Sequence, residues 1–295
     1  ARRPSIWPRP GWMFWLAVGW LTVVVAAAAT AGWWALPAFD AMDWDHPVAA
    51  PGTRSDSVTL QDMTEPENGT YTYWLGADTM GRDVTSRLIY GARVSLAVGL
   101  LSPVIGFFLG GILGCLAGYF RGRLEVVIVA AMDVILAFPG IVLLLAITFY
   151  LGPSLRNLVI ALGFLTIPAF SRVARAKTLT LRDLEFVQAA RLTGAGNLSV
   201  LMREIIPNVI APMAAYALLV VSFMIMAEGA LSFLGLGIPA PTPSWGGMIA
   251  EGKEVLEEAP HVSMIPAGVM FLTVMSFNLI GDSLRRLAEK RTSQL

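Results

Sequence analysis

Charge is what this sequence has least of. Of its 295 residues, 14% are Asp, Glu, Lys or Arg and 56% are hydrophobic, whereas a soluble domain carries roughly 25% charged residues. A soluble fold of this length would have too few polar side chains to cover its surface, so lipid must form part of its surroundings. The formal net charge is zero, so overall charge gives no indication of a nucleic-acid partner.

Three further scarcities exclude other classes of protein. The single cysteine, Cys115, cannot form an internal disulfide. The two histidines, His46 and His261, lie in separate loops without neighbours at ligand spacing, and the apolar runs hold no catalytic constellation. No Gly-x4-Gly-Lys-Ser/Thr loop occurs, so the chain cannot cradle ATP phosphates. We predict no catalytic residue, no metal site and no cofactor in this chain; if ATP drives it, a separate subunit must hydrolyse the ATP.

Long apolar runs are what the sequence has in abundance. Runs of about 20 residues, the length of a transmembrane helix, occur at 12–36, 94–120, 126–151, 155–176, 205–231 and 262–284. We therefore predict an all-α integral membrane protein with six transmembrane helices. The first run follows three arginines, as a signal peptide would, but its length of about 25 residues exceeds the roughly 7–15 of a signal core. We interpret it as a retained span, with cleavage as the alternative.

The basic residues predict the orientation in the membrane. Six lie in one set of loops, and the larger set occupies the two chain ends and the loops around residues 121–123 and 172–203. The positive-inside rule makes the larger set cytoplasmic and places both termini inside. The predicted parts are a cytoplasmic N-terminus with the first helix (1–36), an extracytoplasmic loop (37–92), a five-helix core (93–284) and a cytoplasmic tail (285–295).

The extracytoplasmic loop divides into two parts. Residues 37–73 are rich in Pro, Gly, Thr and Asp and are expected to be irregular. In residues 79–98, apolar positions recur at helical spacing between charged ones, which predicts an amphipathic helix lying on the outer interface.

The cytoplasmic loop 182–207 has the pattern of a helix hairpin. Asp183 and Asn197 are each placed to cap a short helix, and Gly194 lies between the two helices. Pro207 marks the start of the fifth span. The small residues at the corner would let another protein's groove come close to the backbone; an ordinary interfacial hairpin is the alternative interpretation.

This loop resembles the signature of ABC-importer permeases, Glu-Ala-Ala-x3-Gly-x9-Ile-x-Leu-Pro. Here Gln188 replaces the Glu, Glu204 the Ile and Ile206 the Leu. In that family the loop forms the coupling helix, which sits in a cleft of the ATPase subunit. The resemblance implies that the ATPase-coupling residues are Glu185, Gln188, Ala189, Ala190, Arg191, Gly194, Ala195 and Pro207.

Three further segments, residues 74–96, 231–248 and 277–285, resemble the C-type permease of bacterial dipeptide and oligopeptide importers. The resemblance implies the type I ABC-importer architecture in the inner membrane. It implies a heterodimer with a second permease, two ATP-binding subunits that bind ATP and Mg at the cytoplasmic loop, and an extracytoplasmic substrate-binding protein. Candidate contacts of that binding protein are Trp245, Gly246, Gly247, Arg82 and Asp83.

Alternatives remain for the outer loop between the last two spans. Composition alone favours an aromatic-belt anchor for Trp245 over a docking contact. Four glutamates that follow it, with Lys253, predict a solvated helical face: Glu251, Glu254, Glu257 and Glu258.

Polar residues inside the spans are expensive and therefore informative. The candidates for a translocation path or an intramembrane polar contact are Asp133, Arg172, Glu228 and Asn278. Asp133 is expected to form a structural pair, face a partner subunit or line a pathway, and Arg175 is expected to snorkel to the interface. A gradient-driven secondary transporter or channel that uses these acids is the rival function. Within the importer class, the sequence does not choose among peptides, nickel, haem and glutathione.

Overall fold

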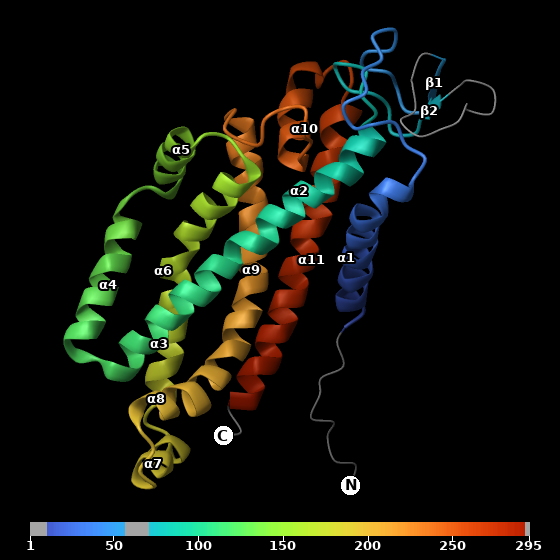
Figure 1. Cartoon of the computed structure of the whole chain (residues 1–295). Helices are drawn as coiled ribbons and strands as arrows, with labels where there is room; N and C mark the ends of the chain where they lie inside the picture. Colours follow the sequence, from blue (N-terminus) through green and yellow to red (C-terminus); the bar gives the residue numbers. More distant parts are fainter. Residues whose placement is uncertain (1–10, 57–70, 293–295) are drawn as a thin grey trace, which may run out of the picture.

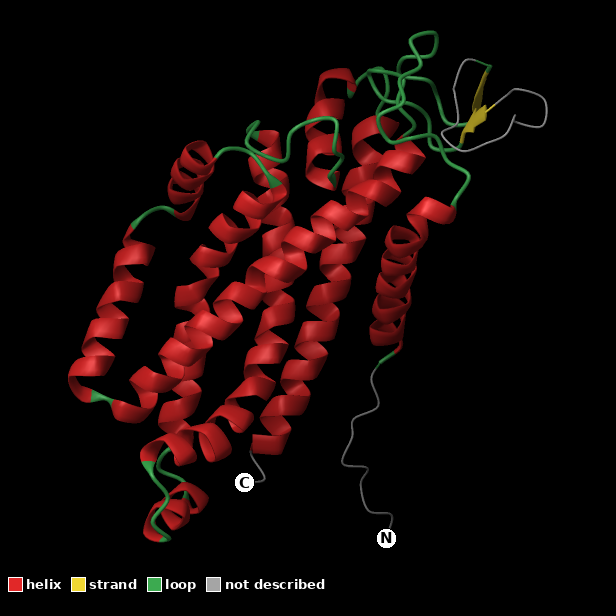
Figure 2. Cartoon of the chain, viewed as in Figure 1, coloured by secondary structure: helices red, strands yellow, loops and turns green. Residues whose placement is uncertain are grey.

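The computed structural model describes residues 11–56 and 71–292, with side chains to Arg286. Long helices dominate it (Figures 1 and 2). Five helical segments are long and apolar enough to cross a membrane: Trp12–Trp33, Val84–Phe120, Leu155–Leu181, Asn197–Phe233 and His261–Arg286. The all-α membrane fold predicted from the apolar runs is therefore confirmed.

These segments contain the named helices. The first contains α1 (Trp12–Thr30), and the second contains α2 (Val84–Ile105), a π-helical turn (Gly106–Gly110) and α3 (Gly111–Phe120). The third is α6 (Leu155–Leu181). The fourth contains α8 (Asn197–Val200), a π-helical turn (Leu201–Ile205) and α9 (Ile206–Phe233), and the last is most of α11 (His261–Thr292). Shorter elements are α7 (Glu185–Leu192) and α10 (Trp245–Gly252).

The prediction of one continuous helix over residues 126–151 is wrong. The chain forms α4 (Gly122–Ala137) and α5 (Gly140–Leu151), which meet at a bend of 85°. Phe138, between them, is extended, with φ −87° and ψ 136°. The following Pro139 explains this, because proline lacks a backbone N–H and disfavours the helical conformation in the residue before it. The described chain thus has five spans, or six if the bent pair counts as one.

The predicted interfacial helix over residues 79–98 is also wrong. Val84 begins α2, which continues directly into the second span. The side chain of Asp83 caps this helix by accepting a hydrogen bond of 2.7 Å from the Ser86 backbone N–H. Earlier in the loop, β1 (Thr53–Ser55) pairs with β2 (Tyr71–Tyr73) in an antiparallel register, so the region expected to be irregular contains a short sheet.

Glycine allows α3 to pack closely on α6. Four glycines follow one another at four-residue intervals along one face: Gly106, Gly110, Gly114 and Gly118. A Cβ on Gly114 would meet the Ser171 carbonyl oxygen and the Ala174 side chain. Small residues at this spacing let two membrane helices approach to backbone contact. The buried core surrounds this seam and includes Leu162, Phe170 and Met213.

Both ends of the bundle can be followed in Figure 1. The start of α1, the end of α11 and the α7 hairpin lie at one end, whereas α10 and the β1–β2 sheet lie at the other. On which side of the membrane each end lies stays a prediction.

Candidate functional site

The hairpin at the α7 end of the bundle has the expected helix–turn–helix form but not the expected caps. Leu184 and Gly196 occupy the cap positions of α7 and α8, and neither provides a side-chain hydrogen bond. Asp183 instead accepts a hydrogen bond of 3.1 Å from Gln188 Nε2 at its backbone oxygen. The second helix is not a separate unit, because the segment from Asn197 continues into the span that ends at Phe233.

A Schellman turn closes α7. Gly194 has φ +89°, and its N–H donates to the Arg191 carbonyl at 3.0 Å, while the Ala195 N–H donates to the Ala190 carbonyl at 3.1 Å. A Cβ on Gly194 would have nothing within 4 Å. The backbone conformation therefore favours glycine here, and the space outside it is open to another molecule.

Tyr119, at the end of α3, holds the hairpin against the bundle. Its hydroxyl donates to Asn197 Oδ1 at 3.1 Å, and the Arg191 guanidinium lies over its ring, 5.1 Å from the centroid. Its backbone oxygen accepts a hydrogen bond of 3.1 Å from Arg182 Nη1. Val187 anchors the inner face of α7, since it is fully buried in the main core. The hairpin is thus fixed to the same helix that packs on α6.

The outer face of the hairpin exposes apolar side chains. Leu192 is 89% exposed and Leu198 is 71% exposed. Among the residues predicted to couple to an ATPase, Ala190 and Ala195 are half-buried and the others are exposed: Glu185, Gln188, Ala189, Arg191, Gly194 and Pro207. Most of these residues are therefore accessible, and all except Pro207, which lies in α9, belong to α7 and the turn that follows it.

At the opposite end of the bundle, four charged side chains form a cluster in which Asp78, Arg82 and Arg87 are buried and Glu251 is about a third exposed. Arg82 pairs with Asp78 and with Glu251, each at 2.7 Å. Arg87 contacts the same carboxylates at 3.2 and 2.9 Å. Glu251, predicted to lie on a solvated face, is 34% exposed and is also part of this ion-pair cluster. Sequence reasoning missed this cluster, because Glu251 lies more than 160 residues from either arginine.

Several predicted binding-protein contacts are buried at this end. Arg82, Asp83 and Trp245 are each at most 1% exposed. The Trp245 indole N–H donates to the Leu88 carbonyl at 3.0 Å. Trp245 is therefore not an aromatic-belt anchor, and these side chains are not available to a docking protein in this conformation. Gly246 is buried as well, and only Gly247 is partly exposed.

Burial also perturbs Asp83. Desolvation raises the pKa of this carboxyl to about 6.

Glu228 is enclosed by serine hydroxyls. Its Oε1 accepts hydrogen bonds of 2.7 Å from Ser232 and from Ser244, and its Oε2 accepts one of 3.3 Å from Ser95. The side chain is fully buried. It joins α2, α9 and the start of α10, as a structural polar contact would. Asn278, on α11, is half-buried.

Two ion pairs connect α4 with α6. Arg172 Nη2 lies 2.8 Å from Asp133 Oδ1, and both side chains are more than half exposed, at 62% and 54%. Arg175 donates from both Nε and Nη2 to Glu125 Oε1, the former at 2.8 Å. A carboxylate on the neighbouring helix therefore binds Arg175, and its expected snorkelling to the interface stays a prediction.

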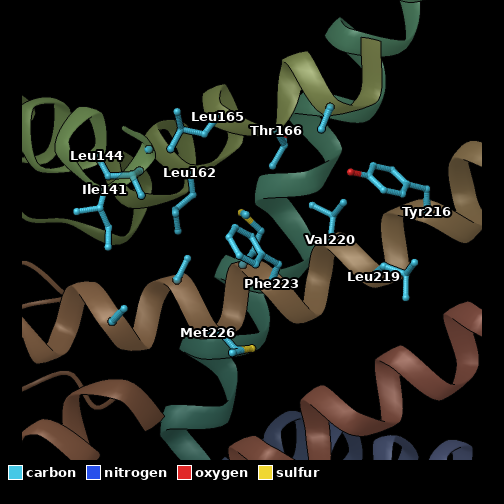
Figure 3. Close-up of a pocket in the computed structure, with 15 residues that line it drawn as sticks. Ile141, Leu144, Leu162, Leu165, Thr166, Tyr216, Leu219, Val220, Phe223 and Met226 are labelled. Atoms are coloured by element: carbon cyan, nitrogen blue, oxygen red, sulfur yellow. The ribbon is translucent and has the colours of Figure 1, made fainter. Parts of the chain in front are cut away.

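An apolar cavity of about 520 Å³ lies between α5, α6 and α9. Figure 3 shows Ile141 and Leu144 at one end of it, and Tyr216 with Leu219 at the other. The two hydroxyl groups in its lining belong to Thr166 and Tyr216. In the part of the chain that the structure describes, no group of three His, Cys, Asp or Glu side chains could hold a metal ion.

Comparison with known proteins gives consistent matches. Residues 110–294 match the family model described as the inner membrane component of binding-protein-dependent transport systems. The glutathione transport system permease protein GsiD of Pectobacterium atrosepticum is 41% identical over 213 residues, which cover 72% of this chain and 71% of that protein. The protein of the same name from Escherichia coli O6:K15:H31 is 40% identical over 231 residues, covering 78% and 76%.

Solved structures show the same fold at lower identity. An inward-facing structure of the MetNI methionine ABC transporter matches with a TM-score of 0.58 and 18% identity, covering 69% of this chain and 97% of that chain. A crystal structure of an amino acid ABC transporter with histidines matches with a TM-score of 0.51 and 20% identity, covering 68% of this chain and 94% of that chain.

Proposed function

Because the chain belongs to the family of inner membrane components of binding-protein-dependent transport systems, we propose that it is the C-type permease subunit of an ATP-driven importer of short peptides, with glutathione among the candidate substrates. As a member of this family it is a multi-pass inner-membrane transport subunit, and ATP hydrolysis belongs to separate subunits.

The observation that carries the proposal is the exposed face of the α7–α8 hairpin. Leu192 and Leu198 project beside Gly194, where the backbone leaves open space. Two isobutyl groups exposed to water at an end of the bundle lose the favourable free energy that burial provides, on the order of 2 kcal/mol each. A groove on an ATPase subunit would bury them, and the Schellman turn fixes the shape that such a groove must fit.

The contacts of the hairpin would also transmit its movement to the transmembrane helices. Arg191 and Asn197 hold it to Tyr119, at the end of α3, and its second helix is continuous with the span that ends at Phe233. An ATPase that pulls on the hairpin would therefore move α3 and α9 together. Alternating access between the two faces of the membrane requires a coupling of this kind.

The translocation path would run beside the cavity between α5, α6 and α9, at an interface with the second permease. This face carries the exposed apolar side chains of α4 and α5, among them Val134, Ile141 and Phe149. A second permease would cover part of this surface and close the cavity to lipid.

A substrate-binding protein would dock at the α10 end. Exposed side chains there include Lys253, Glu254, Glu257 and Glu258, which follow Glu251 of the charge cluster in sequence. The cluster would stabilise the fold beneath the docking surface, and the exposed side chains would make the contacts.

The choice of substrate rests on two observations. The segments 74–96 and 231–248 resemble peptide-importer permeases, and two relatives about 40% identical are named for glutathione, a tripeptide-like molecule. A gradient-driven transporter would need an available carboxylate in the spans. Glu228 is enclosed by hydroxyls, so it does not support that alternative, and the charge of Asp133 is balanced by Arg172.

A site-specific crosslink tests the docking assignment. Cys115 is buried, so Leu192→Cys provides an accessible thiol on the hairpin. Tyr150→Cys is a matched control, because both side chains are 89% exposed and Tyr150 lies at the end of α5, toward the opposite end of the bundle (Figure 1).

We expect a photoactivatable thiol reagent on residue 192 to capture a subunit with a phosphate-binding loop when the complex is expressed with its native partners. The same reagent on residue 150 should not capture it. Mass spectrometry identifies the captured chain. Capture from both positions, or from neither, would contradict the docking assignment.

A further inference from the structure

Two ion pairs connect the same two helices, but their surroundings differ. Glu125 and Arg175 are 16% and 36% exposed, and two guanidinium nitrogens contact one carboxylate oxygen. Asp133 and Arg172 are 54% and 62% exposed, and they share a single hydrogen bond of 2.8 Å. The first pair is built to hold α4 on α6, whereas the second leaves most of both charged groups free to bind something else.

The exposed pair lies along α4 and α6, in a region predicted to cross the membrane. Asp133 is 11 residues beyond Gly122, where α4 begins, or about three helical turns into this helix. Its neighbour Val134 is 62% exposed, as a residue facing lipid or another subunit can be. Charges at this depth are rarely exposed to hydrocarbon and face a protein partner or a water-filled path.

Arg172 lies one helical turn from a residue that lines the cavity. Ala169 lines it, and the ring of Phe170 packs on Tyr216 at 5.3 Å between centroids. Arg172 follows Ala169 by three residues, so it lies on the same side of α6, about one turn beyond the Tyr216 end. The cavity lining itself holds no charged side chain. A solute that moved from the cavity along this side of α6 would come near Arg172 and its partner Asp133.

We propose that Asp133 and Arg172 form a binding station for zwitterionic solutes on the translocation path. Asp133 binds the free ammonium group of a short peptide, and Arg172 binds its free carboxylate. Without peptide, Asp133 and Arg172 pair with each other; with peptide, each pairs with one end of the peptide. Every charge therefore has an opposite charge beside it whether the path is empty or occupied. This inference rests on the proposed importer function and adds to it which chemical groups of the substrate the path recognises.

Uptake of end-blocked peptides tests this station. The complex, with its native partners, is reconstituted in proteoliposomes and supplied with ATP. Initial uptake rates are measured for radiolabelled trialanine, its N-acetyl form and its C-terminal amide. The binding protein contributes equally to wild type and variants, so a change in the preference for free over blocked peptide reports on the path.

We expect Asp133→Asn to reduce uptake of free trialanine about tenfold at low concentration, the effect of losing one charge-assisted hydrogen bond, with a much smaller effect on the N-acetyl form. Arg172→Gln should likewise reduce uptake of free trialanine, with a much smaller effect on its C-terminal amide. Arg175→Gln, one turn away in the structural pair, is the control and should reduce uptake of all three peptides in equal proportion.

The outcomes separate the inference from the function that it rests on. If Asp133→Asn and Arg172→Gln behave like Arg175→Gln or like wild type, the pair is structural and the inference is overturned while the importer stands. If the wild-type complex does not transport the blocked peptides, the uptake rate is instead measured against the concentration of free trialanine for wild type and variants. The inference then requires that Asp133→Asn and Arg172→Gln raise the half-saturating concentration and largely keep the maximal uptake rate. A loss of the maximal rate alone in these variants overturns it. A wild-type complex without ATP-driven uptake of any peptide overturns both.

Discussion

The guanidinium of Arg191 lies over the aromatic ring of Tyr119, and the hydroxyl of the same tyrosine donates to Asn197. One side chain of α3 thus touches both helices of the hairpin. This relationship and four others lead to measurable predictions.

Tyr119 should decide how well hairpin movement reaches the bundle. Tyr119→Phe removes the hydrogen bond to Asn197 and keeps the ring, at a cost of about 1 kcal/mol. Tyr119→Ala removes both contacts, so we expect more ATP to be hydrolysed per peptide imported. Tyr150→Ala, an exposed tyrosine remote from the hairpin, should leave this ratio unchanged. Paired ATPase and uptake assays measure it, and an unchanged ratio in Tyr119→Ala would contradict the mounting role.

Gly194 should be sensitive to side-chain size in a graded way. Gly194→Ala strains the left-handed backbone by about 1–2 kcal/mol, whereas Gly194→Trp also fills the space that a partner would occupy. We expect the tryptophan variant to reach the membrane but to lose transport. Gly235→Trp should retain transport, because Gly235 has a φ of +77°, open surroundings and the same pair of helix-closing hydrogen bonds. Equal loss in both would attribute the effect to backbone strain alone.

The buried cluster at the α10 end should be important for stability. Asp78→Asn leaves Arg82 and Arg87 without one of their two carboxylates, which we expect to lower the free energy of unfolding by about 3 kcal/mol. Glu254→Gln, an exposed neighbour in sequence of Glu251, should change it by less than about 0.5 kcal/mol. Thermal unfolding of the purified complex compares the two variants. Similar melting temperatures would show that the cluster adds little.

Asp83 should make stability depend on pH. Its pKa is about 6 in the folded protein and about 4 in an unfolded chain, so the folded state binds more protons between these values. The free energy of unfolding should therefore fall as pH rises from about 4 to 6, by roughly 2–3 kcal/mol in all. Asp83→Asn keeps the helix cap and should remove this decline. Melting temperatures across this range test it, with Asp56→Asn, an exposed carboxylate, as the control.

The glycine seam should tolerate no side chain. Gly114→Val would push against the Ser171 carbonyl oxygen and Ala174 on α6, and overpacking of this kind costs about 1–3 kcal/mol. Gly19→Val, in α1, has nothing within 4 Å of the added Cβ and should be tolerated. Yield of folded protein and melting temperature distinguish them. A stable Gly114→Val variant would mean that α3 and α6 can separate without loss.

The apolar runs predicted most spans because hydrocarbon selects helices by length and composition alone. They failed at residues 126–151, because the hydropathy of a segment does not show where the helix bends. Pro139 and Gly140 were the available signal for that break. The hairpin was predictable because its small residues and Gly194 follow one another locally in the sequence.

The outer charge cluster could not be predicted in the same way. Arg82 and Arg87 occupy the polar positions of a helical pattern, which suggested a surface helix. Their burial depends on Glu251, which only the packing of α10 on α2 brings near. Asp133 and Arg172 were each expected to be special because charges are rare in spans, but their pairing required the antiparallel contact of α4 with α6.

The helical segment from Asn197 to Phe233 contains 37 residues. Its straight part, α9, has 28 residues and at 1.5 Å per residue is about 42 Å long, whereas the hydrocarbon layer is about 30 Å thick. A tilted α9 can therefore cross the hydrocarbon and still extend beyond it. The hairpin, which precedes α9, would then lie outside the hydrocarbon layer, where a soluble enzyme reaches it without entering the bilayer. Lipids of different chain length should accordingly change the tilt of the spans and leave the hairpin accessible.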